Sequence, residues 1–215
     1  MSKPPTSKSA ATIWLADGRI VDDGELAQHF DWLTADEATR YRRFLRPLRQ
    51  RQFLLGRILL RIALGDLLGI EARSIPLSER PGLAPLLHGV VPVPGFSIAH
   101  SGPWVACAVS ADAALGLDIE MLDATRDLTA LAEQVFSAEE TQQINRQQGA
   151  ARIQAFYELW SRKEAAYKLA SVAAVNGPVH YATLAHPEVS IVLCSAQALS
   201  AVAIRNFSPT QFSQA

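Results

Sequence analysis

The chain has 215 residues and a formal net charge of -1, with 49% hydrophobic and 19% charged residues. This composition excludes a largely disordered chain, and the sequence contains no run of about 18 apolar residues that would span a membrane. The length allows one large domain or two small domains of roughly 100 residues each.

The first element expected after a polar, proline-containing tail is a strand. The tail covers residues 1–10 and lacks the apolar segment of a signal peptide, and the strand covers residues 11–17, ATIWLAD. Thr34 and Glu37 have the spacing of a capping box, which predicts the start of a helix. Apolar residues between positions 54 and 62 predict a second helix, which Gly65 or Gly69 is available to end.

The segment from residue 40 to residue 61 is strongly basic. It holds eight arginines and no acidic residue, although the pI of the whole chain is near 6.5. We expect this segment to face an anion. A compact phosphorylated ligand fits the balanced charge of the remaining chain at least as well as a nucleic acid does.

The middle and end of the chain alternate irregularly between loop, strand and helix signals. Residues 76–95 are rich in proline and glycine and predict a loop. The expected elements after it are strands at 96–102, 104–111 and 114–121, helices near 126–135, 138–147 and 150–173, and strands near 188–194 and 199–205. This pattern favours an α+β fold with helices packed on antiparallel strands. The runs WVACAVS and LSAVAIR resemble each other and suggest an internal repeat in which each half ends in a similar strand.

The two cysteines bear on the cellular compartment. Cys107 and Cys194 lie inside apolar runs, where buried free thiols are more common than a disulfide. Together with the tail, they predict a cytoplasmic protein.

The run GLDIE, residues 116–120, places two acids on one face of a strand. Because successive side chains point to opposite faces, Asp118 and Glu120 share one face while Leu117 and Ile119 take the other. Adjacent carboxylates repel each other, and a divalent cation such as Mg²⁺ is the usual reason to keep both ionised. A solvated strand face is the alternative interpretation.

A third acid, Glu140, follows in the run FSAEE. Ser137 and Glu140 have capping-box spacing, so Glu140 also fits a purely structural role at the start of a helix.

Residues 159–170, LWSRKEAAYKLA, predict a helix on which Trp160, Glu164 and Lys168 follow at four-residue steps. A Glu–Lys pair at this spacing stabilises a helix by roughly 0.2–0.5 kcal/mol, so a solvated salt bridge explains part of the pattern. Trp160 on the same row would partly desolvate Glu164, which favours a general base beside a cation.

His100 and Ser101 stand at the end of a predicted strand, before a Gly-Pro turn. Neighbouring side chains in a strand diverge, which argues against a Ser–His nucleophile pair. Both side chains are instead able to donate hydrogen bonds to phosphate oxygens.

Taken together, these motifs resemble the 4′-phosphopantetheinyl transferases of the Sfp type. The resemblance rests on GLDIE and, about 40 residues later, FYELWSRKEAAYKLA, with FSIAHSG and RPG upstream, and it covers roughly residues 40–175. It implies a pseudo-dimer of two similar α/β halves, residues 11–110 and 111–215, with coenzyme A and Mg²⁺ in the cleft between them. The implied reaction transfers 4′-phosphopantetheine from coenzyme A to a serine of an apo acyl or peptidyl carrier protein and releases 3′,5′-ADP.

The resemblance also implies roles for the acids and the lysine. Asp118 and Glu120 resemble the metal-binding acids, and Glu140 matches a less constant third acid. Glu164 resembles the general base, and Lys168 resembles the lysine that accompanies it.

The resemblance matches Arg80, His100 and Lys163 to coenzyme contacts, and Ser101, Arg51 and Arg57 are further candidate contacts. Two positions depart from the family pattern. Ala99 replaces the first serine of the usual SHS, which is expected to remove one hydroxyl from the phosphate pocket. Gln52 stands where many relatives carry arginine, so Arg51 or Arg57 is expected to compensate.

Two alternatives stay open at this point. A metal-dependent phosphohydrolase would use the same acids with water as the nucleophile and would cleave a nucleotide diphosphate without an acceptor protein. A nucleotide- or nucleic-acid-binding module would use residues 40–61, leave the acids solvated and bind RNA in a salt-dependent way without metal. For the transferase we expect a monomer that binds neither nucleic acid nor membranes.

Overall fold

The computed structural model describes residues 9–214 and has the α+β arrangement predicted from the sequence. Of the predicted tail, residues 1–8 lie outside the described part, and the first strand already begins at Ala10. The strands are β1 Ala10–Asp17, β2 Leu77–Ser78, β3 Leu86–Leu87, β4 Gly95–Ser101, β5 Trp104–Ser110, β6 Leu115–Met121, β7 His180–Leu184, β8 Val189–Ser195 and β9 Ala201–Asn206. The α-helices are α1 Asp23–Gln28, α2 Ala35–Arg43, α3 Pro47–Leu68, α4 Leu128–Val135, α5 Ala138–Asn145 and α6 Gly149–Val172. Short 3-10 turns are η1 Gly18–Ile20, η2 Phe30–Trp32, η3 Ala72–Ser74 and η4 Pro209–Gln214.

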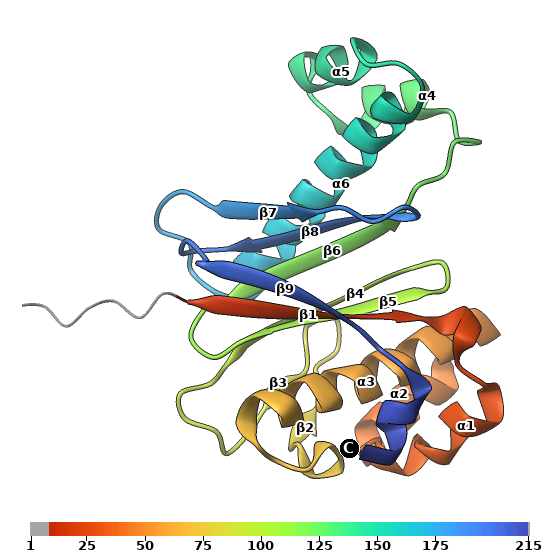
Figure 1. Ribbon diagram of the computed structural model, residues 1–215, viewed down its shortest axis with the longest axis vertical. Coiled ribbons are helices and arrows are strands. Elements are labelled where there is room, and N and C mark those ends of the chain that lie inside the picture. Colours follow the sequence, from red (N-terminus) through yellow and green to blue (C-terminus); the bar gives the residue numbers. More distant parts are fainter. Residues whose placement is uncertain (1–8, 215) are drawn as a thin grey trace, which may run out of the picture.

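Two sheets form the centre of the molecule (Figure 1). The first sheet has the order β4–β5–β1–β9, with β9 parallel to β1 and the other pairs antiparallel. The second sheet has the antiparallel order β6–β8–β7. Apolar side chains on the facing sides of the two sheets form one core, while α3 packs on the outer side of the first sheet and α6 on the outer side of the second. The result is four layers, helix, sheet, sheet and helix.

The two sheets share one order of connections. β1 leads through helices to the long α3 and then to β4 and β5, and β6 leads through helices to the long α6 and then to β7 and β8. In each sheet the last of these strands lies in the middle, so β8 corresponds to β5. The predicted correspondence of WVACAVS with LSAVAIR is wrong, because the second run forms β9 and pairs with β1 at the edge of the first sheet.

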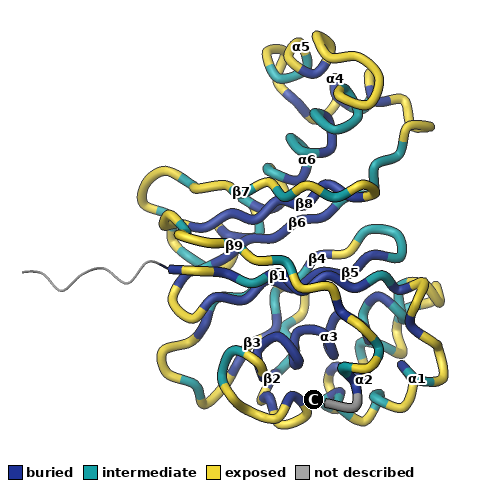
Figure 2. The backbone as a smooth tube through the Cα atoms, viewed as in Figure 1, coloured by how far each residue is buried: buried dark blue, intermediate teal, exposed yellow. Residues whose placement is uncertain are grey.

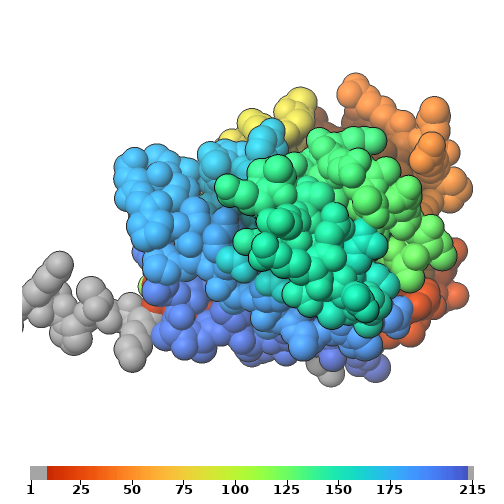
Figure 3. All heavy atoms as spheres, turned by 90° about the horizontal axis from the view of Figure 1, so that it is seen from above, coloured from red at the N-terminus to blue at the C-terminus, as the bar shows by residue number. Residues whose placement is uncertain are grey.

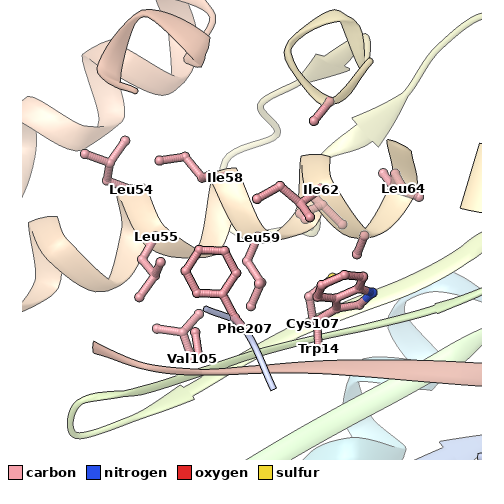
Figure 4. Packing of buried hydrophobic residues seen from close by; sticks show 14 of the residues in the cluster. Trp14, Leu54, Leu55, Ile58, Leu59, Ile62, Leu64, Val105, Cys107 and Phe207 are labelled. Carbon is pink, nitrogen blue, oxygen red and sulfur yellow. The ribbon is translucent and has the colours of Figure 1, made fainter. Parts of the chain in front are cut away.

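The limits of α3 follow from its local sequence. Pro47 occupies the first turn, where a missing N–H is harmless, and Gly69 ends the helix in the left-handed conformation with φ of 68°. The stop predicted at Gly65 or Gly69 is therefore confirmed at Gly69, and the capping box of Thr34 and Glu37 is confirmed at the start of α2. Figure 4 shows the apolar side of α3 packed onto the first sheet.

The end of the chain returns to the first half. Phe207 and Phe212 pack into the core around α3, and Phe212 stacks on His29 with ring centroids 4.4 Å apart. The predicted division near residue 110 coincides with the loop between β5 and β6, whereas residues 201–212 pack on the first half.

Burial is concentrated in the sheets and the two long helices, and α4 and α5 are mostly exposed (Figure 2). These two helices project at one end of the molecule, and they lie in front when that end is viewed directly (Figure 3, green to teal). Phe136, Phe156 and Trp160 attach them to α6 through a small separate core.

Cys107 and Cys194 are buried free thiols on β5 and β8, as predicted. Among residues 9–214, no helix is both long and apolar enough to cross a membrane.

Candidate active site

Asp118 and Glu120 lie on the outer face of β6, the face that α6 covers. Asp118 is only 5% exposed, while Leu117 and Ile119 point into the core between the sheets. Asp118 Oδ1 accepts a hydrogen bond from Lys168 Nζ at 2.8 Å, and Glu120 Oε2 accepts one from Ser101 Oγ at 2.8 Å. The two carboxylates therefore share a face, and each is held by a side chain from another element.

Burial raises the pKa of both carboxyl groups. For Asp118 the loss of solvent is opposed by Lys168, and the negative charge of Glu164 adds to the rise. For Glu120 the loss of solvent is opposed by the Ser101 hydrogen bond, and the charge of Asp118 adds to the rise. The poorly solvated surroundings therefore disfavour negative charge on both carboxyl groups. A bound cation would stabilise that charge.

Gly116 allows α6 to approach β6 closely enough for Lys168 to reach Asp118. A Cβ atom at position 116 would lie 2.0 Å from the Ala165 carbonyl oxygen and 2.8 Å from the Leu169 amide nitrogen. Without that atom the helix crosses the strand in backbone contact, and Lys168 also donates to the Leu117 carbonyl oxygen at 2.9 Å. The glycine of GLDIE is therefore as much part of the site as its acids.

The oxygen atoms of Asp118 and Glu120 fit a hard divalent cation. Asp118 Oδ2 is buried and makes no hydrogen bond of ordinary geometry to the described residues, which leaves a charged acceptor available. Cations such as Mg²⁺ are commonly held by one or two carboxylates together with substrate phosphates.

Glu140 does not join this acid pair. It closes the predicted capping box with Ser137 and pairs with Lys163 at 2.9 Å, and the Lys163 contact lowers its pKa. Within the described part of the chain, no group of three or more His, Cys, Asp or Glu side chains is arranged to hold a metal ion. Lys163, predicted to contact the coenzyme, is thus occupied by Glu140 and lies over the Phe136 ring.

His100 and Ser101 diverge, as the strand predicts. Ser101 faces β6, where its hydroxyl donates to Glu120 and accepts from the Met121 amide at 3.0 Å. His100 faces the other way, with Nε2 2.7 Å from a guanidinium nitrogen of Arg49. Desolvation in the cleft and the charge of Arg49 lower the pKa of His100 to about 4, so the ring is neutral at pH 7 although one side stays exposed.

The guanidinium of Arg49 lies beside Gln52, whose own side chain is uncharged. It donates to Gln52 Oε1 at 2.6 Å, and Gln52 Nε2 donates to the Gly102 carbonyl oxygen at 2.6 Å. Desolvation and the neighbouring Arg40 lower the pKa of Arg49, and no carboxylate of the described residues pairs with it. Sequence reasoning missed Arg49, although its spacing of three residues from Gln52 places both on one side of a helix.

Arg51 and Arg57 are engaged by protein partners. Arg51 points to another side of α3, where it donates to the Gly18 and Val21 carbonyl oxygens and pairs with Asp23. Arg57 lines the cleft but is buried, and its guanidinium pairs with Glu79 at 2.7 Å and with Glu37 at 3.1 Å. Arg51 and Arg57 are thus neutralised by acidic side chains. Arg49 lies beside Gln52 without such a partner among the described residues.

A cleft between α3 and α6 connects these side chains. One cavity of about 270 Å³ is lined by Arg49 from α3, His100 from β4, and Tyr167 and Lys168 from α6. A second cavity of about 280 Å³ shares residues of the 84–85 loop with the first and is lined by Arg80. Arg80 Nε donates to the Ala84 carbonyl oxygen at 2.9 Å and so braces that loop.

A larger opening of about 660 Å³ lies on the side of α3 where Arg51 is found. Lys168, which holds Asp118, and His100 line the smaller cleft between α3 and α6 and not this larger opening.

Glu164 is exposed on α6, within range for its charge to raise the pKa of Asp118. The predicted desolvation of Glu164 by Trp160 is wrong. Trp160 instead packs on Phe156 and Phe136, with ring centroids 6.2 and 6.5 Å apart, because the core beneath α4 and α5 draws the aromatic rings away.

Ala99 faces away from the cleft. It is 3% exposed and belongs to the core between the sheets. The expected loss of a phosphate-binding hydroxyl is wrong, because strand alternation places residue 99 on the opposite face from His100.

Parts of the chain are similar to known proteins. Residues 114–209, which include β6 and α6, match the family model described as the 4′-phosphopantetheinyl transferase superfamily. The chain is 32% identical to the 4′-phosphopantetheinyl transferase HetI of a Nostoc species over 138 residues, which are 63% of this chain and 58% of that protein. It is 36% identical to the transferase psf-1 of Bacillus pumilus over 119 residues, 55% of this chain and 49% of the relative.

A 4′-phosphopantetheinyl transferase of Bacillus subtilis is 29% identical over 153 residues, 71% of this chain and 66% of that protein. The chain thus spans roughly half to two thirds of the length of the curated relatives named here. Its second half is the part that the superfamily match covers.

Proposed function

We propose that this protein is a 4′-phosphopantetheinyl transferase of the Sfp type, which transfers 4′-phosphopantetheine from coenzyme A to a serine of an apo carrier protein. The observation that carries the proposal is the arrangement of Asp118, Glu120 and Lys168 beside a cleft lined by Arg49 and His100. Paired acids next to a basic cleft suit a diphosphate substrate whose charge must be neutralised. The transferase relatives and the superfamily match support the same chemistry.

We further propose that the two halves are a pseudo-dimer, residues 11–110 and 111–215, that arose by duplication. The shared order of strands and long helix supports this proposal. The coenzyme would then lie across the junction of β4 and β6, where the two halves meet.

The coenzyme would bind along the cleft between α3 and α6. Arg49 and His100 would contact its phosphates, and Arg80 would contact the nucleotide end through the adjoining cavity. For the other predicted contacts we propose supporting roles. Ser101 orients Glu120, and Arg57 fixes the Glu79 loop. Arg51 fixes the segment at Gly18.

In the proposed reaction the serine oxygen forms a bond to the β-phosphorus of coenzyme A, the bond from that phosphorus to the bridging oxygen breaks, and 3′,5′-ADP leaves. Glu164, exposed on α6, would accept the serine proton. Lys168 would hold Asp118 in place and stabilise charge on the bridging oxygen. Mg²⁺ bound by Asp118 and Glu120 would neutralise the diphosphate; Glu140 stays a predicted third ligand that would first have to leave Lys163.

The test is mass spectrometry of apo acyl and peptidyl carrier proteins incubated with the protein, coenzyme A and Mg²⁺. The proposal expects one phosphopantetheine added per carrier, on a serine, and a chemical step slowed by about 10²- to 10⁴-fold in Glu164→Gln with coenzyme A still bound. Cleavage of coenzyme A without any carrier would instead indicate the phosphohydrolase. Salt-dependent RNA binding without metal would indicate the binding module.

The cytoplasmic location, the monomeric state and the absence of nucleic-acid and membrane partners stay predictions. Size-exclusion chromatography with light scattering tests the oligomeric state directly.

A further inference from the structure

Three buried polar atoms without hydrogen-bond partners gather at the acid pair. They are Asp118 Oδ2, Ser161 Oγ and Ser190 Oγ, none of which makes a hydrogen bond of ordinary geometry to another described residue. Ser161 and Ser190 are both 0% exposed. Because buried hydroxyl groups are nearly always hydrogen-bonded in native proteins, such a cluster needs an explanation.

The backbone geometry places both serines next to the acids. Ser190 is directly opposite Glu120 in the antiparallel pair β6–β8, so the two side chains share one face at close range. Ser161 is four residues, about 6.0 Å along the helix axis, before Ala165, which touches β6 at Gly116. Asp118 is two residues, roughly 6.6 Å, along the strand from that contact. The Ser161 hydroxyl is near enough to lower the pKa of Asp118.

Neither hydroxyl is explained by the stability of the fold. Apolar side chains surround this face of the second sheet, with Ala165, Leu169 and Val192 forming its core. Among the described residues, the Ser190 hydroxyl has no hydrogen-bond partner and so costs free energy, while the Ser161 hydroxyl interacts with Asp118. Two buried hydroxyls beside the same pair of acids point to a function there.

We propose that Ser161 and Ser190 are positioning residues that orient the carboxylates of Asp118 and Glu120 toward a divalent cation. This inference rests on the proposed function, in which the acid pair holds Mg²⁺. The Ser161 hydroxyl donates to the Asp118 carboxylate and the Ser190 hydroxyl to the Glu120 carboxylate, and each bond fixes the rotamer of its carboxylate. Outer partners of this kind typically account for roughly 10- to 100-fold in metal affinity.

The experiment measures Mn²⁺ affinity by electron paramagnetic resonance and thermal unfolding without metal, for wild type, Ser161→Ala and Ser190→Ala. The expected result is an affinity weakened about 10-fold or more in each variant. The melting temperature without metal is expected to be unchanged or raised. A purely structural role would produce the opposite pattern, a lower melting temperature with unchanged affinity.

Ser110→Ala is the matched control. Ser110 is also a buried serine, but its hydroxyl donates to the Ala10 carbonyl oxygen at 2.6 Å in the first sheet. This control should lose stability and keep its Mn²⁺ affinity.

Unchanged Mn²⁺ affinity in both test variants overturns the inference. So does a wild-type protein that binds no Mn²⁺ yet modifies a carrier protein, and that result leaves the transferase proposal standing. If the two serine variants bind Mn²⁺ more weakly than the wild type but the wild type modifies no carrier protein, the inference is supported and the transferase proposal is overturned.

Discussion

At the residue scale, the arginines of the basic segment divide by whether a carboxylate already neutralises them. Arg40, Arg51, Arg57 and Arg61 form ion pairs with acidic side chains. Arg49 lines the cleft and has no such partner among the described residues. An unpaired guanidinium in a partly desolvated cleft is the strongest anion-binding group that the segment offers.

Arg49→Ala should therefore weaken coenzyme A binding by about 10- to 100-fold, the range expected for a hydrogen bond between charged groups. Isothermal titration calorimetry with coenzyme A measures this change. Arg51→Ala is the control, since Arg51 bonds to Gly18 and Val21 and should affect stability and not affinity. A larger loss of affinity for Arg51→Ala than for Arg49→Ala would refute the assignment.

His100 should make the stability of the protein depend on pH. Its pKa in the folded state, about 4, lies below the ordinary value of 6.5, because desolvation and Arg49 disfavour the charged ring. As the pH falls below about 6.5 the unfolded chain takes up a proton that the folded state does not, so stability is lost until the pH reaches about 4. Urea unfolding between pH 7.5 and pH 4 should show this loss, and His100→Gln should reduce it. An identical pH dependence in the variant would exclude His100 as a cause.

At the scale of elements, the contact of α6 with β6 sets the distance between the lysine and the acids. Gly116→Ala should destabilise the protein by at least the roughly 1–3 kcal/mol of ordinary overpacking, because the new Cβ meets helix backbone and not a flexible side chain. Displacement of α6 would also separate Lys168 from Asp118 and reduce transfer. Chemical denaturation and a transfer assay measure the two effects.

Gly56→Ala, in the long helix α3, is the control for the effect on stability. Its Cβ would meet Ile98 and Val105 side-chain carbons at 3.6 Å, an ordinary contact, so the variant should be neutral or stabilised by up to about 1 kcal/mol. Equal stability of the Gly116 and Gly56 variants would mean that α6 shifts without cost.

The junction of β4 and β6 is bridged by serine hydroxyls. Ser97 Oγ accepts from the Leu117 amide and Ser101 Oγ from the Met121 amide, each at 3.0 Å. Alternation places Ala99 and Ile119 between these two bridges. Ala99→Ser should add a bridge and stabilise the protein by about 0.5–1.5 kcal/mol, with coenzyme A affinity unchanged. Tighter coenzyme A binding by this variant would show that residue 99 faces the ligand after all.

The elements that the sequence predicted well are those whose limits are local. The capping box at Thr34 and the glycine at position 69 define helix ends without reference to the rest of the chain. β7 was missed because His180–Leu184 is a half-exposed edge strand with little apolar character. The pairing of β9 with β1 joins residues more than 190 positions apart, such as Ala10 and Ala201, and no local pattern reports such a pairing.

The candidate site divides in the same way. Strand alternation placed Asp118 and Glu120 on one face and separated His100 from Ser101. The engagement of Arg51 by Gly18 and of Lys163 by Glu140 depends on which element lies opposite, so a motif alone does not reveal it.

At the scale of the whole molecule, the two sheets share one core, from which we predict that residues 11–110 and 111–215 do not fold independently. Five aliphatic side chains of the second sheet, Leu117, Ile119, Val189, Ile191 and Leu193, are 0% exposed and belong to the core that faces the first sheet. Exposing side chains of this size costs about 1.5–3 kcal/mol each, roughly 8–15 kcal/mol together. That cost is comparable to the entire stability of a typical protein, about 5–15 kcal/mol.

Residues 111–215 expressed alone should therefore be unfolded or molten, although they contain the acids, Glu164 and Lys168. In the isolated half β9 also loses β1, its partner in the first sheet, which exposes further backbone. The full chain should unfold in one cooperative transition, with calorimetric and van't Hoff enthalpies that agree. Circular dichroism and proton NMR of the isolated half provide the measurement. A sharp melting transition and dispersed methyl signals in that fragment would show that each half folds without the other, and the cleft would then be an interface between domains.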